Sequence, residues 1–208
     1  VVAVMGSNGI KAIVCDPAGT PVIRKPKNHE AFKAASRAFA QGLSSHPVCG
    51  TGLPTYGTKV LVNILNEAGG LPTKNFSVGR FEGADKICAE TMVEIQKRRG
   101  GNPTHGCHRG CIMKCSGICV DENGEFVSKQ PEYETVWSHG AHCGVDDLDK
   151  IILCDRLEDD YGLDTIETGA ALGVLMEAGV LKWGDIDGII AMIHEIGKGT
   201  PMGRILGA

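Results

Sequence analysis

The chain lacks any apolar run approaching the ~18 residues that a membrane-spanning helix requires, so we expect no membrane association. A segment rich in Lys and Arg is also missing, and the formal net charge is −4, so nucleic acid is not an expected partner. No positively charged segment precedes an apolar stretch, and we therefore expect no signal peptide. Repeats and low-complexity tracts are absent too, and the 208 residues are expected to form a globular fold.

Both ends of the chain interrupt a sequence pattern. Val1 opens an apolar run over residues 1–4, where a complete protein would begin with Met. The last six residues, 203–208, carry no pattern that would end a domain. We therefore interpret the chain as an internal fragment of a longer protein.

Cysteine is abundant, with nine residues, four of which fall within thirteen positions as Cys107, Cys111, Cys115 and Cys119. Secreted disulfide domains are normally shorter and have an even count, so we expect a reducing, cytoplasmic compartment and a thiolate metal site. The spacing favours an iron–sulfur cluster over zinc, because zinc ribbons use paired Cys-x2-Cys knuckles. Four other cysteines lie in apolar patterns and are predicted to be buried thiols: Cys15, Cys49, Cys88 and Cys154.

Hydrophobic patterning predicts a short β segment followed by helices. β-Branched runs predict strands at residues 1–4, 11–14 and 21–23. Helical periodicity, with N-caps at Asn28 and Asp185, predicts helices at about residues 29–43, 60–67, 84–99, 146–160, 165–178 and 186–193. Between the third and fourth of these helices, Asn123-Gly124 predicts a β-hairpin and Pro131 predicts the start of a further helix. The predicted fold class is mainly α, with a β segment (residues 1–25) before a multi-helical domain (residues 26–208).

The helix predicted at residues 165–178 is apolar almost all round, which indicates a buried helix. The segment before it, Asp159-Asp160-Tyr161-Gly162-Leu163-Asp164-Thr165, joins two predicted helices. Gly162 can end the first helix in a left-handed conformation, and Asp164 or Thr165 can cap the second. The amides at such a helix start can receive an anion, although the same pattern also suits a plain helical corner.

A third segment, Pro131-Glu132-Tyr133-Glu134-Thr135, follows the hairpin. Its glutamates lie in the first turn of a predicted helix, where acidic residues commonly interact with the helix dipole and occasionally act as acids or bases. His139 and His142, a little further on, are expected to be structural residues.

In their order along the chain, these segments resemble the tungsten-containing aldehyde:ferredoxin oxidoreductase family. The resemblance covers nearly the whole chain, at residues 3–7, 11–13, 69–76, 107–119, 131–135, 143–147 and 162–169. It implies that residues 1–25 are the remnant of an N-terminal α+β cofactor domain. It also implies that a further helical domain follows residue 208.

The resemblance implies two cofactors and assigns residues to them. A [4Fe–4S] cluster is expected on Cys107, Cys111 and Cys115, with its fourth ligand beyond this chain and with Cys119 left out. A tungsten (or molybdenum) bis-pterin is expected beside it, bound through Asp159, Gly162, Leu163, Asp164 and Thr165, and through a loop containing Met5, Gly6 and Ser7. Glu134 is the expected catalytic acid or base, with Glu132 in reserve.

The function implied is oxidation of small aldehydes to carboxylic acids, with electrons passing to ferredoxin in the cytoplasm of an anaerobe. A homodimer is a possible assembly, and the fragment alone is expected to be inactive. One alternative within the family is a tungsten enzyme that reduces aromatic thioesters of the acyl-CoA type. The others are a non-catalytic iron–sulfur electron-transfer module, with Cys119 as fourth ligand, and a zinc-stabilised helical domain.

Overall fold

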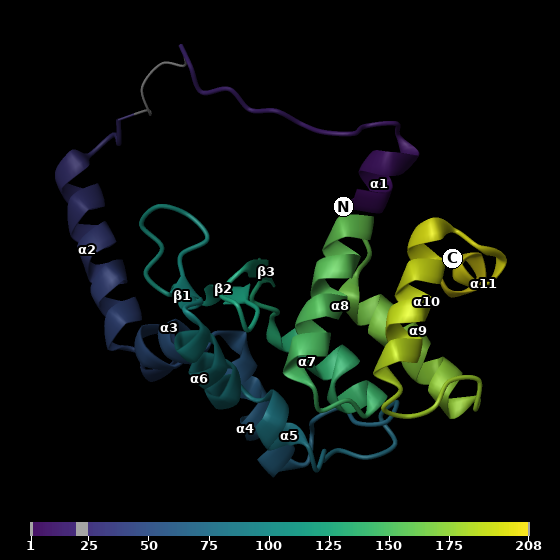
Figure 1. Cartoon of the computed structure of the whole chain (residues 1–208). Coiled ribbons are helices and arrows are strands. Elements are labelled where there is room, and N and C mark those ends of the chain that lie inside the picture. Colours follow the sequence, from purple (N-terminus) through teal and green to yellow (C-terminus); the bar gives the residue numbers. More distant parts are fainter. Residues whose placement is uncertain (1, 20–24, 208) are drawn as a thin grey trace.

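A computed structural model describes residues 2–19 and 25–207, which form helices around one apolar core with a small sheet at its side (Figure 1). The predicted mainly α fold class is confirmed. The helices are α1 (Val2–Ser7), α2 (His29–Ser45), α3 (Leu53–Tyr56), α4 (Leu61–Ala68), α5 (Ala84–Ile87), α6 (Ala89–Arg99), α7 (Tyr133–His139), α8 (Leu148–Tyr161), α9 (Thr165–Glu177), α10 (Ile186–Lys198) and α11 (Pro201–Leu206). Shorter turns of helix are η1 (Pro47–Gly52), η2 (Thr58–Val60) and η3 (Ala141–Cys143). Among the described residues, every helix is too short or too polar to cross a bilayer.

The sheet is antiparallel, in the order β1 (Asn102–His105), β2 (Ser116–Val120) and β3 (Phe126–Lys129). The predicted hairpin is confirmed as β2 and β3, although its connection is five residues long. The carboxylate of Asp121 accepts hydrogen bonds from the amides of Asn123 and Glu125, so the turn is wider than a two-residue turn. Strand β1 was not predicted, because its residues show neither alternation nor an apolar run.

Most of the other helices begin close to where they were predicted, because N-capping residues mark their first turns. Asn28, Asp147 and Asp185 each accept a hydrogen bond from an amide in the first turn of α2, α8 and α10. The predicted helix at residues 84–99 is interrupted at Cys88, which is extended, with φ −72° and ψ 168°. Helix α7 begins two residues after Pro131, because Glu132 is extended and serves as its N-cap.

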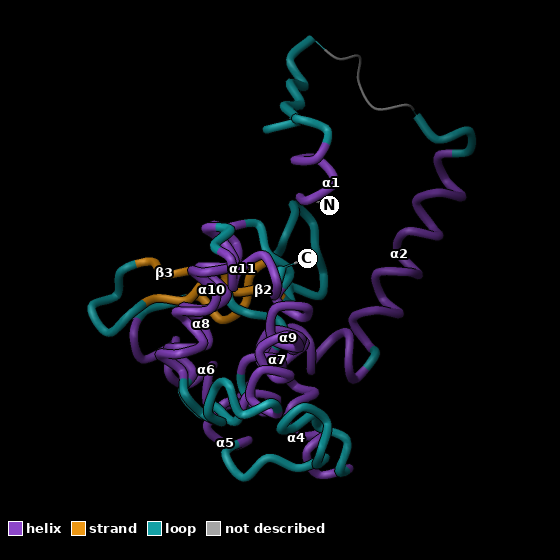
Figure 2. Tube along the Cα trace, turned by 90° about the vertical axis from the view of Figure 1, so that its right-hand side faces the viewer, coloured by secondary structure: helices purple, strands orange, loops and turns teal. Residues whose placement is uncertain are grey.

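The N-terminal strand predictions are wrong where the structure describes them. Residues 2–7 form helix α1, and residues 11–17 have no regular structure. The predicted strand at residues 21–23 lies outside the described residues. No strand in the described part of the chain pairs with residues 2–19, and an isolated strand leaves its backbone groups unpaired, whereas a helix satisfies them internally. Figure 2 shows this segment and α2 standing away from the main body.

The core lies between α4–α6 and α7–α10. Its fully buried side chains include Met92, Val136, Ile151, Leu172 and Ile193. Helix α9 buries one face only, so the prediction that it is enclosed on almost all sides is wrong: Val174 is 58% exposed.

The predicted core thiols divide into two groups. Cys88 and Cys154 are buried, as predicted. Cys15 is exposed and Cys49 is half-buried, because they belong to the N-terminal segment and to η1, which lie outside the core.

Candidate functional site

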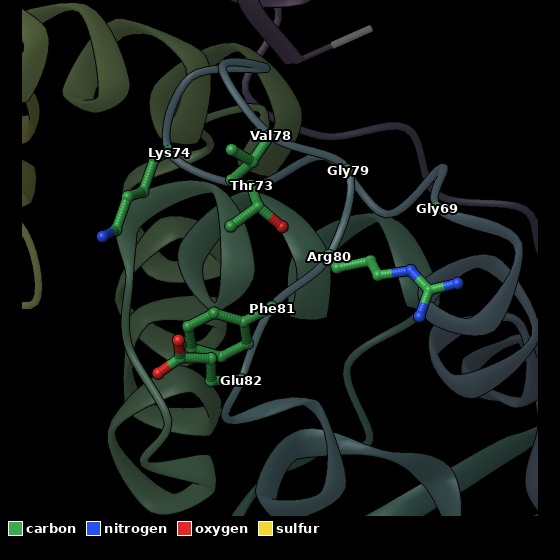
Figure 3. A pocket seen from close by; sticks show the side chains of 8 residues that line it. All are labelled: Gly69, Thr73, Lys74, Val78, Gly79, Arg80, Phe81 and Glu82. Atoms are coloured by element: carbon green, nitrogen blue, oxygen red, sulfur yellow. The ribbon is translucent and has the colours of Figure 1, made fainter.

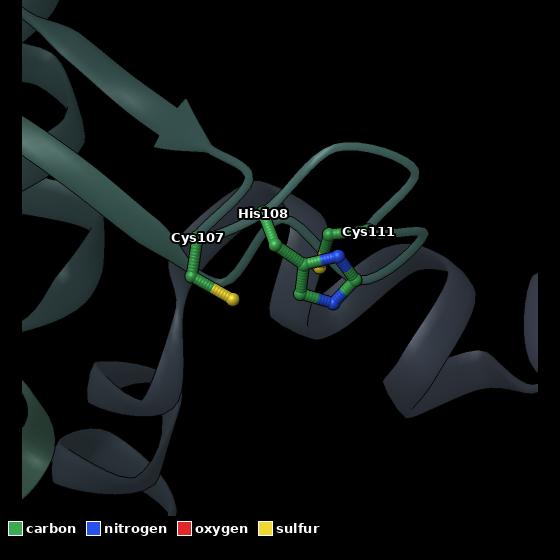
Figure 4. Close-up of side chains that lie close together, drawn as sticks. All are labelled: Cys107, His108 and Cys111. Carbon is green, nitrogen blue, oxygen red and sulfur yellow. The ribbon is translucent and has the colours of Figure 1, made fainter. Parts of the chain in front are cut away.

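The cysteine loop, residues 106–115, connects β1 to β2 and brings two of the three predicted ligands together. The ligand atoms of Cys107, His108 and Cys111 all lie within 4.8 Å of one another (Figure 4). Cys115 is not a member of this group. It lies at the foot of the loop, half-buried, in a parallel bridge with His105. His108 was not predicted, and its place beside Cys107 in the sequence was the only available signal.

Backbone geometry in the loop favours a thiolate at Cys111. Lys114 adopts a left-handed conformation, with φ +44°, and its amide points at the Cys111 sulfur at 3.4 Å. This hydrogen bond is the main reason that the pKa of Cys111 is lowered. Burial instead raises the pKa of Cys115, helped by the nearby carboxylate of Glu132. N–H groups directed at cysteine sulfur are among the interactions that stabilise iron–sulfur clusters.

Cys119 differs from the loop cysteines. It lies within β2, its side chain is fully buried, and burial raises its pKa to about 12. Without a bound metal such a thiol is protonated at neutral pH, in contrast to Cys111, whose pKa is lowered.

The two candidate glutamates lie in different surroundings. Glu132 is half-buried at the start of α7, where its Oε2 accepts a hydrogen bond from the Thr58 hydroxyl at 2.5 Å. The same hydroxyl accepts a hydrogen bond from the Tyr133 amide at 2.9 Å. Glu134, the first choice from the sequence, is exposed. Glu132 is therefore the glutamate that lies next to the cysteine loop.

Lys59 also lies against this loop, and sequence reasoning missed it. Its side chain is buried in η2, and its Nζ has no hydrogen-bond partner among the described residues. Gly57, two residues earlier, has φ +65°, and a Cβ there would lie 2.6 Å from the Cys115 carbonyl oxygen and 2.7 Å from Lys59 Nζ. The chain therefore reaches Cys115 this closely because residue 57 is glycine.

The segment containing Gly162 forms the predicted corner between α8 and α9. Gly162 is left-handed, and the Asp164 carboxylate accepts hydrogen bonds from the amides of Ile166 and Glu167, at 3.0 and 3.1 Å. Asp164 rather than Thr165 is thus the cap. The Thr165 hydroxyl lies 2.9 Å from that of Thr135, which ties the corner to α7.

A cavity of about 570 Å³ opens at this corner. Gly162, Leu163 and Asp164 line it, together with residues of α9 and the C-terminal residues Leu206 and Gly207. The structure therefore places on one cavity three of the five residues that were predicted to bind the pterin from residues 159–165. Asp159 instead faces β3, where its carboxylate lies 3.3 Å from the Lys129 ammonium.

Asn75 lines the same cavity and is a third residue that sequence reasoning did not assign, after His108 and Lys59. It belongs to three consecutive left-handed residues, Lys74, Asn75 and Phe76, with φ of 45°, 50° and 61°. The amides of Lys74 and Asn75 donate to the carbonyls of Ala141 and His142, and the Asn75 side chain donates to Glu177. Such strained backbone is commonly found at functional sites.

A second cavity, of about 660 Å³, lies beside this loop, and Figure 3 shows the residues that line it. Its lining includes Lys74 and Arg80, and the Arg80 guanidinium donates to the carbonyl of Glu67 at 2.6 Å. No residue predicted to bind a cofactor lines this cavity.

Met5, Gly6 and Ser7 were predicted to form a loop, but the structure places them in helix α1. Gly6 and Ser7 are exposed, and the Ser7 hydroxyl donates to the carbonyl of Val4 at 2.9 Å. The structure does not bring these residues to the cavity at Gly162. Their assignment to a cofactor stays a prediction.

Comparison with known proteins identifies the relatives of this chain. Residues 34–208 match the family described as aldehyde ferredoxin oxidoreductase, domains 2 & 3. The tungsten-containing aldehyde ferredoxin oxidoreductase of Thermococcus kodakarensis is 41% identical over 178 residues, which cover 84% of this chain and 27% of the relative. Its counterpart in Pyrococcus furiosus is 36% identical over 211 residues, covering 94% and 33%. The WOR-like subunit of an aliphatic sulfonate oxidoreductase from the same organism is 26% identical over 222 residues, covering 98% and 34%.

One family model therefore matches this chain over most of its length. The chain belongs to the aldehyde ferredoxin oxidoreductase family, in the region of domains 2 and 3. The chain spans about a third of the length of the curated relatives it matches.

Proposed function

We propose that the protein containing this chain oxidises aldehydes to carboxylic acids, and that the cysteine loop holds a [4Fe–4S] cluster through Cys107, Cys111 and Cys115. The observation that carries the proposal is the loop itself, where the sulfurs of Cys107 and Cys111 lie close together and an amide is directed at one of them. This donor set fits a cluster, because thiolates are its usual ligands and N–H···S hydrogen bonds are common around it. The fourth ligand would come from outside the chain.

The corner between α8 and α9 is the proposed binding site for a tungsten or molybdenum bis-pterin, which supplies the oxidation chemistry when bound. Gly162, Leu163 and Asp164 would contact it from the cavity they line, with Asp159, Thr165 and the segment 5–7 as further proposed contacts. Thr165, at the corner, lies 2.9 Å from Thr135 of α7, and the Tyr133 amide at the start of α7 donates to Thr58 of η2. Helix α7 thus contacts both the corner and η2, and Gly57, just before η2, lies beside Cys115.

A carboxylate on α7 would hold or accept a proton, because oxidation of an aldehyde to an acid releases protons as well as electrons. Glu134 and Glu132 both stay candidates, and their positions suggest different roles. Glu134 is exposed and free to meet a substrate, whereas Glu132 is held by Thr58 beside the cysteine loop. Ferredoxin is the proposed electron acceptor, on the strength of the names of the relatives. The cytoplasm of an anaerobe is the proposed setting.

Purification of the complete protein from tungstate-fed anaerobic cells tests this proposal. We expect iron, acid-labile sulfide and tungsten in the protein, together with aldehyde-dependent reduction of viologen. Glu134→Gln and Glu132→Gln are each expected to lower kcat, by about 10²–10⁴-fold for whichever residue transfers the proton. Protein without tungsten and molybdenum would rule out the pterin assignment. A protein that reduces aromatic thioesters but not aldehydes would support the alternative within the family.

A zinc-stabilised domain is the second candidate function, and His108 favours it. His and Cys together are typical zinc ligands, and His108 lies within the group formed by Cys107 and Cys111. The same elemental analysis separates the two candidates. Stoichiometric zinc without iron or sulfide would support the zinc site, and His108→Ala should then reduce the zinc content. In a cluster-containing protein, His108→Ala is expected to leave the iron content unchanged.

A further inference from the structure

The ammonium group of Lys59 is buried against the cysteine loop without a hydrogen-bond partner. The residue is 1% exposed, and Nζ has no acceptor within bonding distance among the described residues. Nζ and the carbonyl oxygen of Cys115 both lie within 2.7 Å of the point that a Cβ on Gly57 would occupy. The end of the Lys59 side chain therefore lies directly beside the backbone of a proposed cluster ligand.

An unpaired buried ammonium is strongly unfavourable, and Lys is rarely fully buried without a partner. Burial lowers the pKa of Lys59, whereas negative charge on Glu132, Cys119 and Cys115 raises it. A negatively charged group nearby would compensate for the cost of burying this ammonium.

Glu132 is hydrogen-bonded to the Thr58 hydroxyl and forms no ion pair with Lys59 within 4.0 Å. Lys59 Nζ therefore lies beside the backbone of Cys115 without a hydrogen-bond partner among the described residues. An anionic group held at Cys115 would supply the missing partner.

We propose that Lys59 is the charge partner of the cluster held at Cys107, Cys111 and Cys115, and that it raises the reduction potential of that cluster. The proposal rests on the proposed function. Reduction adds a negative charge to the cluster, so a fixed positive charge in a low-dielectric environment stabilises the reduced state more than the oxidised one. Lys59 touches neither substrate nor pterin in this proposal and is a positioning residue.

The other cations near the cluster site are unsuited to this role. Arg109 and Lys114 belong to the loop but are exposed, and water and salt screen exposed charges. Lys59 is the buried lysine among the described residues of this region, and its stem is enclosed in the fold. Its charge therefore acts through protein rather than through solvent.

The test compares the complete cluster-containing protein with its Lys59→Met variant in a redox titration followed by EPR of the reduced cluster. We expect the reduction equilibrium of the variant to be less favourable by about tenfold, a shift of 59 mV to lower potential for a one-electron couple. Lys59→Arg keeps the charge and is expected to retain a potential close to that of the wild type.

Lys86→Met is the matched control. Lys86 is an exposed lysine whose ammonium pairs with Asp146 at 2.5 Å, away from the cysteine loop. This variant loses the same charge from the protein surface, and its cluster potential is expected to be unchanged. An equal shift in both variants would overturn the proposal, because net charge rather than position would then be the cause.

Other outcomes are equally decisive. An intact cluster with an unchanged potential in Lys59→Met overturns the proposal. If Lys59→Met does not accumulate, Lys59→Gln replaces it as an uncharged variant of similar length. Loss of iron from both uncharged variants, with iron retained in Lys59→Arg, supports the charge role, and loss from all three contradicts it. Wild-type protein without iron would instead overturn the proposed function, so the two failures are distinguishable.

Discussion

Gly57 is a single residue on which the cluster site depends. Its φ of +65° and ψ of −166° form a combination that is essentially restricted to glycine. A Cβ at this position would collide with the carbonyl oxygen of Cys115, at 2.6 Å. The backbone strain and the steric collision would both arise where the chain at Gly57, just before η2, contacts Cys115 of the cysteine loop.

We therefore expect Gly57→Ala to destabilise the protein by about 2–5 kcal/mol, from backbone strain and overpacking together. The iron content per chain should fall with it, because Cys115 would be displaced. Chemical denaturation and iron analysis of the purified variant measure the two effects. Gly100→Ala is the control, since Gly100 is also left-handed (φ +84°) but has nothing within 4 Å of the added Cβ. Full iron content in Gly57→Ala would show that the close approach is unimportant.

A buried pair of ionisable residues lies between α7 and α8. His139 Nε2 is 3.0 Å from Glu158 Oε1, both side chains are fully buried, and Glu158 Oε2 has no partner. Burial raises the pKa of Glu158, and the hydrogen bond from His139 offsets only part of this effect. His139 was expected to be structural, and its position in the core agrees with that expectation.

The raised pKa of Glu158 means that the folded chain binds a proton more tightly here than the unfolded chain. The stability that this group contributes is therefore complete below its ordinary value of 4.5 and is lost as the pH rises through the folded-state pKa. Each unit of pKa difference corresponds to about 1.4 kcal/mol. We expect the unfolding free energy of Glu158→Gln to fall less steeply across this window than that of the wild type. Urea unfolding at a series of pH values measures the difference, and parallel curves would contradict it.

Elements with strong local end signals were predictable from sequence. The caps Asn28, Asp147 and Asp185 act within three residues of their own position, so no distant contact is needed to identify them. The left-handed Gly162, and a cap at Asp164 or Thr165, were predicted for the same reason, and the structure has Asp164 as the cap. Strand β1 was missed because its pairing partner, β2, lies beyond the cysteine loop. The break at Cys88 was missed as well.

Helix α9 packs against α7 and η3 through two glycines. A Cβ on Gly169 would lie 2.7 Å from Ser138 Cβ and 2.8 Å from its carbonyl oxygen, and one on Gly173 would lie 2.2 Å from His142 Nε2. The helices approach this closely because both positions lack a side chain. This contact holds the corner at Gly162 next to α7.

We expect Gly169→Ala to destabilise the chain by about 1–3 kcal/mol, because the methyl group meets the backbone of α7. Gly42→Ala is the matched control in the exposed helix α2, where nothing lies within 4 Å of the added Cβ. That substitution should stabilise the chain by about 0.5–1 kcal/mol, the usual gain for alanine over glycine within a helix. Thermal unfolding of both variants separates the steric effect of the added methyl group from the effect of helix propensity. Equal changes in unfolding free energy for the two variants would contradict the packing argument.

At the scale of the whole molecule, the described residues form one core with an exposed segment beside it. Helix α2 contains no buried residue, and its Phe32 and Phe39 are 59% and 69% exposed. The cavity at Gly162 is likewise lined from one side by the cap and α9, and from another by the last residues of the chain. These features agree with a chain that spans about a third of its relatives.

We expect the 208-residue chain alone to show no aldehyde-dependent reduction of viologen, because the proposed pterin site and the fourth cluster ligand need further sequence. The complete protein, assayed under the same anaerobic conditions, is the positive control. Activity in the chain alone, after reconstitution with iron and sulfide, would show that the pterin site and the cluster do not need residues from outside this chain.

Most of the helix positions, the hairpin and the thiol-rich loop could be inferred from residues close together in the sequence, because caps, turns and ligand spacing are local. The order of the motifs along the chain indicated the family. The burial of Lys59 and the pairing of Glu132 with Thr58 could not be inferred in this way. Both depend on segments that folding brings together, across 74 residues in the case of Thr58 and Glu132. The N-terminal strands show the same limit, since β-branched residues favour a strand only where a partner strand is present.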